Sequence, residues 1–368
     1  NGDFSIYTGV AGVICALITC GYKDDALLLV RHHFENAEAV FCSHENQKRK
    51  LITGVAGFFI ISCVVLKDRQ ECDKTLLERA QQHALTSLEA FTNSSTIECE
   101  FLYGAAGALY CIRLLQANGH PENERLDRLR GVLVNYLVRV HGRDGRWLWH
   151  GKEYYGAAHG AAGILLMLQR SGQHELRGSR FVKDVFSALL VDARIPASGN
   201  FKSSRDSLSD KLVQWCHGAP GMLLLLLEIY NTMQDSGHPQ QAELEELRAV
   251  IGAAAQVVAE RGMLTKWLGL CHGMGGNGLV LLLCCKALKR PYPTLFQQQQ
   301  AQQEQGEEQD VCAPFVAAVL DHQKLLGRGQ LQLADSPFSL FQGIAGAMCF
   351  LHAYLNPAVC AFPAFTDY

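Results

Sequence analysis

A Gly-x-x-Gly step followed directly by an apolar run occurs seven times along the chain. The spacing between successive steps ranges from 45 to 70 residues, and their first glycines are Gly9, Gly54, Gly104, Gly160, Gly218, Gly273 and Gly343. A period of this length accommodates two helices and the connections between them. The chain is therefore predicted to consist of seven helical hairpin repeats.

Each repeat is expected to contain two kinds of helix. The run after a step is apolar nearly all round, as in residues 279–283, which indicates an inner helix buried on all sides. Stretches between the steps, such as 126–140 and 244–258, place apolar residues three and four apart, which indicates an outer helix with one buried face. Strand signals are almost absent.

These patterns predict an all-α fold in which the repeats close into an (α/α) double barrel, or toroid. The Gly-x-x-Gly loops should then lie together at one rim, because each of them opens an inner helix. The alternative is an open superhelix, whose end repeats would need polar outer faces.

The bulk composition indicates one large core. The chain has 368 residues, 48% of them hydrophobic, and we expect a single domain over residues 1–368 with a Gln-rich surface insertion at about 291–310. Charged residues make up 19% and the net charge is -3, so no nucleic-acid partner is expected. Apolar runs such as 54–66 are shorter than the ~18 to 20 residues of a membrane-spanning helix, and no transmembrane segment is expected.

The 14 cysteines are scattered through apolar stretches, without the regular spacing of a small secreted domain held by disulfides. Reduced thiols in the cytoplasm are therefore expected. We also expect a monomer, and the sequence leaves peripheral association with the plasma membrane open.

The predicted rim has a chemical character of its own. Helix N-termini present free N–H groups and the positive ends of helix dipoles, which favour anions and thiolates. The glycines could instead serve only to let the helices pack closely. For five of the seven loops this packing explanation is the favoured one.

Two of the loops carry adjacent cysteine and histidine residues, namely Cys216 with His217 and Cys271 with His272. Because both pairs fall at the same point of neighbouring repeats, four ligands of the kind that zinc prefers come within reach of one ion. Four ligands would form a closed structural site, whereas three would leave a position open, as in catalytic zinc sites. Spacing alone does not choose between them, and buried thiols with loop-capping histidines and no metal are the third possibility.

The glycine steps and several of the loops resemble those of a known family, the eukaryotic lanthionine synthetase C-like proteins. The resemblance rests on the seven steps and on the segments 155–160, 215–221, 269–273 and 337–341, and it covers essentially the whole chain. It implies that Cys216, Cys271 and His272 bind zinc and that His217 does not.

The resemblance also implies a reaction. Bacterial relatives add a peptide cysteine thiol to dehydroalanine or dehydrobutyrine, and eukaryotic members bind glutathione and add it to dehydroamino acids in proteins. By the same resemblance, Lys266 would contact glutathione, His159 would donate a proton, and Glu100 would be an acidic residue of the site. Each of the three could instead be structural: a solvated lysine, a hydrogen-bonded loop histidine or a structural carboxylate. Gln342 departs from the family pattern, in which relatives carry glutamate, and this puts the activity in doubt.

Two other functions compete with a zinc-dependent, glutathione-using enzyme. A non-catalytic adaptor could bind zinc and glutathione, or a peptide, at the same rim. A toroidal glycosidase or prenyl-type cyclase would need paired carboxylates or aspartate-rich magnesium motifs, and neither occurs on the glycine loops.

Overall fold

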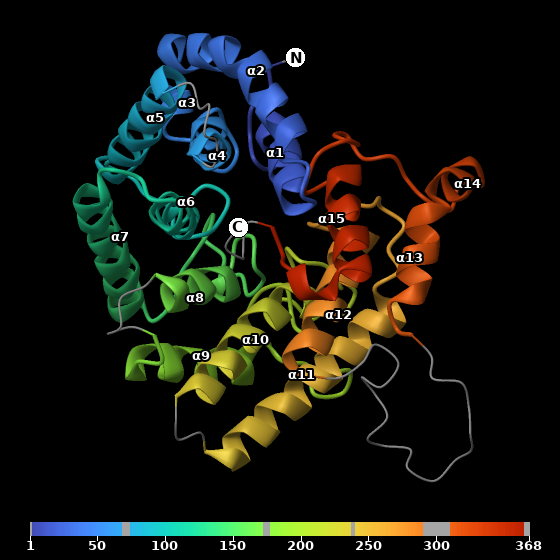
Figure 1. Cartoon of the computed structure of the whole chain (residues 1–368). Helices are drawn as coiled ribbons and strands as arrows, with labels where there is room; N and C mark the ends of the chain where they lie inside the picture. Colours follow the sequence, from blue (N-terminus) through green and yellow to red (C-terminus); the bar gives the residue numbers. More distant parts are fainter. Residues whose placement is uncertain (1, 68–73, 172–176, 237–239, 290–309, 364–368) are drawn as a thin grey trace.

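The computed structural model describes residues 2–67, 74–171, 177–236, 240–289 and 310–363, and these form two concentric rings of helices (Figure 1). The inner ring consists of α1 (Val10–Thr19), α4 (Ala56–Lys67), α6 (Ala105–Ala117), α8 (Ala161–Arg170), α10 (Ala219–Asp235), α12 (Met274–Ala287) and α15 (Ile344–Leu355). The outer ring consists of α2 (Lys23–Ser43), α5 (Lys74–Thr92), α7 (Asn123–Asp144), α9 (Arg180–Ala193), α11 (Gln241–Arg261) and α13 (Ala313–Leu320). Short helices α3 (Glu45–Lys48), α14 (His322–Gly327) and η3 (Pro357–Val359) complete the described elements.

The inner ring is closed. Each inner helix packs against the next, and α15 returns to pack against α1. The predicted all-α toroid is therefore confirmed, and the open superhelix is wrong. Within the described residues six inner helices are followed by an outer partner, while α15 is followed by η3. The predicted Gln-rich insertion lies outside the described residues except for Asp310.

Burial distinguishes the two rings as the apolar patterns predicted. In α4 every residue from Ala56 to Leu66 is buried, so the helix is enclosed by neighbours on all sides. In α11 the buried residues, among them Leu244, Leu247 and Ile251, form one stripe that faces the inner ring. Apolar side chains of both rings are thus removed from water in one core cluster.

The Gly-x-x-Gly steps are explained by close packing at the start of each inner helix. A Cβ atom added to Gly107 would lie 2.1 Å from the carbonyl oxygen of Phe101, in the loop that leads into α6. The equivalent atom on Gly276 would lie 2.1 Å from the carbonyl oxygen of Leu270, ahead of α12. Only glycine lets the first helical turn fold back against its own loop at this distance.

Backbone hydrogen bonds connect the loops to one another around the ring. They run from the amide of one loop to the carbonyl of its neighbour: Tyr7 to Ile52, Phe101 to Ala158, Ala157 to Trp215, Cys216 to Cys271, Cys271 to Phe341, and Phe341 to Tyr7. Loops joined in this way lie at one end of the barrel, which is the predicted rim. Any side chain carried by a loop at this rim is held on a fixed scaffold.

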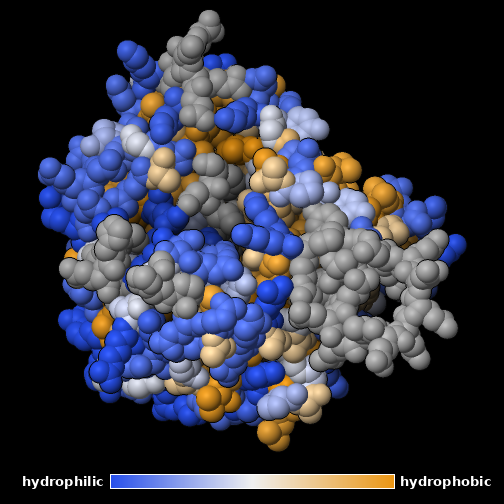
Figure 2. Space-filling view, turned by 60° about the horizontal axis from the view of Figure 1, so that its bottom comes forward, coloured by the Kyte–Doolittle hydropathy of each residue, from blue (hydrophilic) through white to orange (hydrophobic). Residues whose placement is uncertain are grey.

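The face in Figure 2 is largely hydrophilic, with apolar residues in small separate groups. No described helix is both long enough and apolar enough to cross a bilayer.

Candidate metal centre

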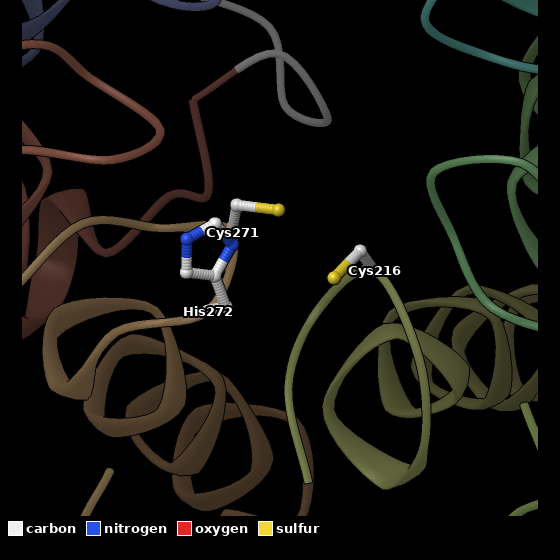
Figure 3. Close-up of side chains that lie close together, drawn as sticks. All are labelled: Cys216, Cys271 and His272. Atoms are coloured by element: carbon white, nitrogen blue, oxygen red, sulfur yellow. The ribbon is translucent and has the colours of Figure 1, made fainter. Parts of the chain in front are cut away.

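Three predicted ligands converge at the rim (Figure 3). Cys216 lies in the loop before α10, and Cys271 and His272 lie in the loop before α12. One ligand atom from each of the three lies within 4.8 Å of the others. The Cys271 side chain points across toward Cys216, so the two sulfur atoms and the imidazole border one small space.

The two thiols are buried, and their ionisation is linked. Cys216 is 8% exposed and Cys271 is 2% exposed. A hydrogen bond with the Cys271 thiol holds the pKa of Cys216 well below its usual range, and His272 also bonds to Cys216. Burial, followed by the neighbouring Cys216 sulfur, raises the pKa of Cys271. Of the two thiols, Cys216 is therefore the more acidic.

This donor set fits a zinc ion. Two thiolates and one imidazole are ligands that zinc takes, and a tetrahedral site with zinc–sulfur bonds of about 2.3 Å requires donor atoms spaced as closely as these. A divalent cation would also remove the repulsion that keeps both buried thiols from ionising together. Three protein ligands leave one coordination position for a further group.

His217 does not join the cluster. Its ring lies 5.6 Å from the Tyr154 ring, centroid to centroid, and it bonds to the backbone of Ser203. Burial lowers the pKa of this imidazole, and its Nδ1 atom has no hydrogen-bond partner within the described part of the chain. The arrangement agrees with a ligand set that excludes His217.

A second layer of polar side chains surrounds the sulfur atoms. Gln214 donates a hydrogen bond from Nε2 to the Cys216 sulfur at 3.1 Å. The Tyr7 hydroxyl bonds to the Cys271 sulfur and to the side chain of Gln342, and burial raises the pKa of Tyr7 above its usual range. Donors of this kind orient metal ligands and adjust their basicity.

Sequence reasoning missed Tyr7, although the repeat register contains a signal for it. Tyr7 stands two residues before the first glycine of its step, as Cys216 and Cys271 do in theirs. Equivalent positions of different repeats face the same rim, so a polar aromatic residue at this position is a candidate neighbour of the metal. Gln342 occupies the next position of its own repeat, as His272 does.

The structure brings His159 and Glu100 together on the same rim. Their loops lead into α8 and α6, and His159 Nδ1 lies 2.6 Å from Glu100 Oε2. Glu100 is 1% exposed, and its carboxylate accepts the backbone N–H groups of Leu102, at 3.0 Å, and Tyr103. The imidazole also stacks on Trp149, with ring centroids 3.7 Å apart and planes 4° apart. The histidine is thus held in one orientation by a buried carboxylate and an aromatic plane.

Lys266 is exposed and lies five residues before Cys271. Its positive charge lowers the pKa of the Cys271 thiol, acting against burial, and it also lowers the pKa of His217. The lysine is therefore near enough to the cluster to act on it electrostatically. This is a suitable position for attracting an anionic ligand to the rim.

The fold and this cluster define a class of protein, a helical toroid with a candidate Cys/His metal centre among its glycine-rich loops. Residues 1–366 match the family described as lanthionine synthetase C-like protein, and the chain belongs to this family.

Similar proteins support the assignment. Glutathione S-transferase LANCL1 of Danio rerio is 28% identical over 390 residues, which cover 99% of this chain and 85% of that protein. LanC-like protein GCL1 of Arabidopsis thaliana is 28% identical over 275 residues, which cover 72% of this chain and 57% of that protein. Among solved structures, nisin cyclase matches with a TM-score of 0.68 at 15% identity, covering 99% of this chain and 92% of the other. That last likeness concerns the fold.

Proposed function

We propose that this protein is a zinc-dependent enzyme that adds glutathione to dehydroalanine or dehydrobutyrine residues of peptides and proteins, forming a thioether. The observation that carries the proposal is the presence, on one rim, of a three-ligand Cys/His cluster and a histidine held by a buried carboxylate. The name of the zebrafish relative, a glutathione S-transferase, supports glutathione as the thiol.

Cys216, Cys271 and His272 would hold the zinc. When bound, zinc supplies a Lewis acid that lowers the pKa of a thiol ligand and so makes a thiolate available near neutral pH. The hydrogen bonds from Gln214 and Tyr7 to the two cysteine sulfurs disperse part of their negative charge. These donors therefore limit how strongly the cysteines neutralise the cation.

His159 is the proposed proton donor. Addition of a thiolate to the β-carbon of a dehydroamino acid leaves negative charge on the α-carbon and its carbonyl, and one proton must be delivered to the α-carbon. Because Nδ1 of His159 is engaged by Glu100, Nε2 is the ring atom that can give this proton. Glu100 holds the ring in place, and the stack on Trp149 prevents it from turning.

Lys266 is the proposed contact for a carboxylate of glutathione. Its exposed ammonium group acts electrostatically on Cys271, so a glutathione carboxylate at Lys266 would place the rest of the molecule over the cluster. Glutathione carries two carboxylates, which makes a cation at the rim a useful anchor. The proposal places the enzyme in the cytoplasm as a monomer.

The alternative, an adaptor that binds zinc and glutathione without chemistry, needs the cluster and a cation but no proton donor. The Glu100–His159 pair, with its buried carboxylate and stacked ring, therefore favours the enzyme.

Mass spectrometry of a dehydroalanine peptide incubated with glutathione and the zinc-loaded protein tests the proposal. The wild type should form the glutathione adduct well above the uncatalysed rate. His159→Asn should keep its zinc and slow the addition by about 10² to 10⁴-fold, the usual contribution of a positioned acid or base. His217→Asn, which alters the equivalent position of the next repeat, should stay near wild type. No catalysed adduct with any dehydroamino-acid peptide would favour the adaptor.

A further inference from the structure

The first backbone N–H group of an α-helix has no partner within its own helix, and five of the inner helices satisfy this group in the same way. The group donates to the backbone carbonyl seven residues earlier, in the loop that leads into the helix. These bonds measure 2.8 to 3.2 Å and join Val10 to Asp3, Ala105 to Glu98, Ala161 to Tyr154, Met274 to Trp267 and Ile344 to Pro337. Each of the five loops is thus closed directly onto the helix that follows it.

The loop that carries Cys216, ahead of α10, departs from this arrangement. The backbone N–H of Ala219 donates to Oδ1 of Asn200 at 2.9 Å. The carbonyl of Leu212, seven residues before Ala219, accepts from Nδ2 of Asn200 at 3.1 Å. The amide group of Asn200 is therefore inserted between two backbone groups that bond directly in the five other repeats. Because two hydrogen bonds and an amide group span the distance of one bond, this loop is held wider open.

The backbone just before α10 differs in the same repeat. Gly218 has a φ of +101°, in the left-handed region, whereas the corresponding glycines of the five other loops have φ values between -103° and -121°. A Cβ atom at position 218 would lie 2.1 Å from the Leu212 carbonyl oxygen and 3.2 Å from Asn200 Oδ1. Glycine is therefore required for the chain to pass around the inserted amide.

The Asn200 side chain is fixed in orientation. It is fully buried, and Nδ2 also donates to Asp210 Oδ1 at 2.7 Å. Arg261, the last residue of α11, holds that carboxylate in turn, with Nη1 3.2 Å from Asp210 Oδ2. Both donors and the acceptor of the Asn200 amide are thus satisfied, and a buried polar network of this kind is rigid.

A second buried asparagine holds the same loop from the side of the other two ligands. Asn277 is 1% exposed and lies in α12, directly after the loop that carries Cys271 and His272. Its Nδ2 atom donates to the carbonyl oxygens of Val213 and Gly262, each at 2.9 Å. The Cys216 loop is therefore tied to the helix that follows the other ligands.

Cys216 lies between these attachments, in a tight turn. Two backbone hydrogen bonds between Gln214 and His217, both 3.1 Å long, close the turn. From it the Cys216 sulfur borders the space shared with the other two ligands (Figure 3). Asn200 is bonded to the chain on both sides of this turn, so a change in the width of the loop changes where the sulfur lies.

We propose that Asn200 is a positioning residue of the metal centre. Its inserted amide sets the width of the loop before α10 and so places the Cys216 sulfur at the distance from Cys271 and His272 that one ion requires. Asn277 keeps the loop in register with the other two ligands. The inference rests on the proposed zinc site and does not depend on the proposed reaction with glutathione.

The test is to measure metal binding by Asn200→Ala. Without the amide, the Ala219 N–H can bond directly to the Leu212 carbonyl, as in the other repeats, so the fold should survive while Cys216 moves. Zinc affinity, measured in competition with a chelator, should fall about 10 to 100-fold, the usual cost of losing a group that orients a metal ligand. Cobalt(II), used as a spectroscopic probe of the same site, should show weaker thiolate-to-metal charge-transfer absorption than in the wild type.

Gln169→Ala is the matched control. Gln169 is also a buried amide that holds backbone, since it accepts from the Gly178 N–H at 3.1 Å and donates to the Thr232 hydroxyl at 3.0 Å. It lies near the C-terminal end of α8, away from the rim. The control should lose stability in urea unfolding of the metal-free protein as Asn200→Ala does, but it should keep wild-type zinc affinity and the wild-type cobalt spectrum.

A second variant decides the matter if Asn200→Ala does not fold. Combining Asn200→Asp with Asp210→Asn keeps the net charge, the hydrogen bond between the two side chains and the acceptor for Ala219, and it removes the bond to Leu212. Zinc affinity should again fall at least about 10-fold. The proposal is overturned if a folded variant at position 200 binds zinc with wild-type affinity and gives the wild-type cobalt spectrum. A wild type that binds neither metal would refute the metal centre itself.

Discussion

Replacing Gly107 by alanine tests the explanation of the repeat motif. The added Cβ atom would lie 2.1 Å from the Phe101 carbonyl oxygen and 3.0 Å from the Ile52 side chain. Ordinary carbon–oxygen contacts are longer than about 3.2 Å, so the start of α6 and the loop before it would have to separate by about 1 Å. Because both are backbone segments within a closed ring, neither can move without disturbing its neighbours.

We expect Gly107→Ala to lower the free energy of unfolding by about 3 kcal/mol, at the upper end of the usual cost of overpacking a core. Gly252→Ala is the matched control. Gly252 lies inside α11, and a Cβ atom there would meet nothing within 4 Å. This change should raise stability by about 0.5 to 1 kcal/mol, because alanine favours the helix more than glycine does. Both values follow from urea unfolding monitored by circular dichroism. If Gly107→Ala is as stable as Gly252→Ala, close packing does not explain the motif.

Two further predictions concern the site, and a third concerns His120, a buried histidine that follows α6. Glu100→Gln should keep bound zinc but slow glutathione addition by at least about 10-fold, since His159 loses its buried anionic partner; unchanged turnover would remove Glu100 from the mechanism. Tyr7→Phe removes the hydroxyl that bonds to the Cys271 sulfur and should weaken zinc affinity by about 10-fold in competition with a chelator, whereas an unaltered affinity would show that this bond does not matter. Burial lowers the pKa of His120, so its contribution to stability is present above its ordinary pKa of 6.5 and is lost as the pH falls below it. His120→Gln should therefore lose less stability than the wild type between about pH 7 and pH 5 in urea unfolding, and equal losses would contradict this linkage.

The fold could be predicted from the sequence because few other residues can replace glycine where two backbone segments are in close contact. Seven steps at a regular period mark where inner helices begin, and the fully apolar runs after them identify the inner ring. Ring closure could be expected from the same pattern. What the pattern does not contain is that η3 follows α15 within the described residues, because no glycine step marks where this short helix begins.

The sequence predicts which residues of the candidate site lie on the rim, but it does not predict the contacts between their side chains. The repeat register places Cys216 and Cys271 at equivalent positions, and it places His272 and His159 at the next position of their repeats, on the same rim. The contact between His159 and Glu100 spans 59 residues, and the stack on Trp149 depends on side-chain orientation in a connecting segment. Register indicates the face on which a residue lies, but a contact between side chains depends on how neighbouring repeats are rotated relative to one another. That rotation is set by packing over the whole ring.

The most direct test of the central claim is to titrate zinc into metal-free protein while measuring the rate of glutathione addition to a dehydroalanine peptide. The rate should rise in proportion to bound zinc and level off at one equivalent per chain, and Cys271→Ala should neither retain zinc nor accelerate the reaction. A metal-free protein that adds glutathione at the full rate, or a Cys271→Ala variant that does so, would contradict the account.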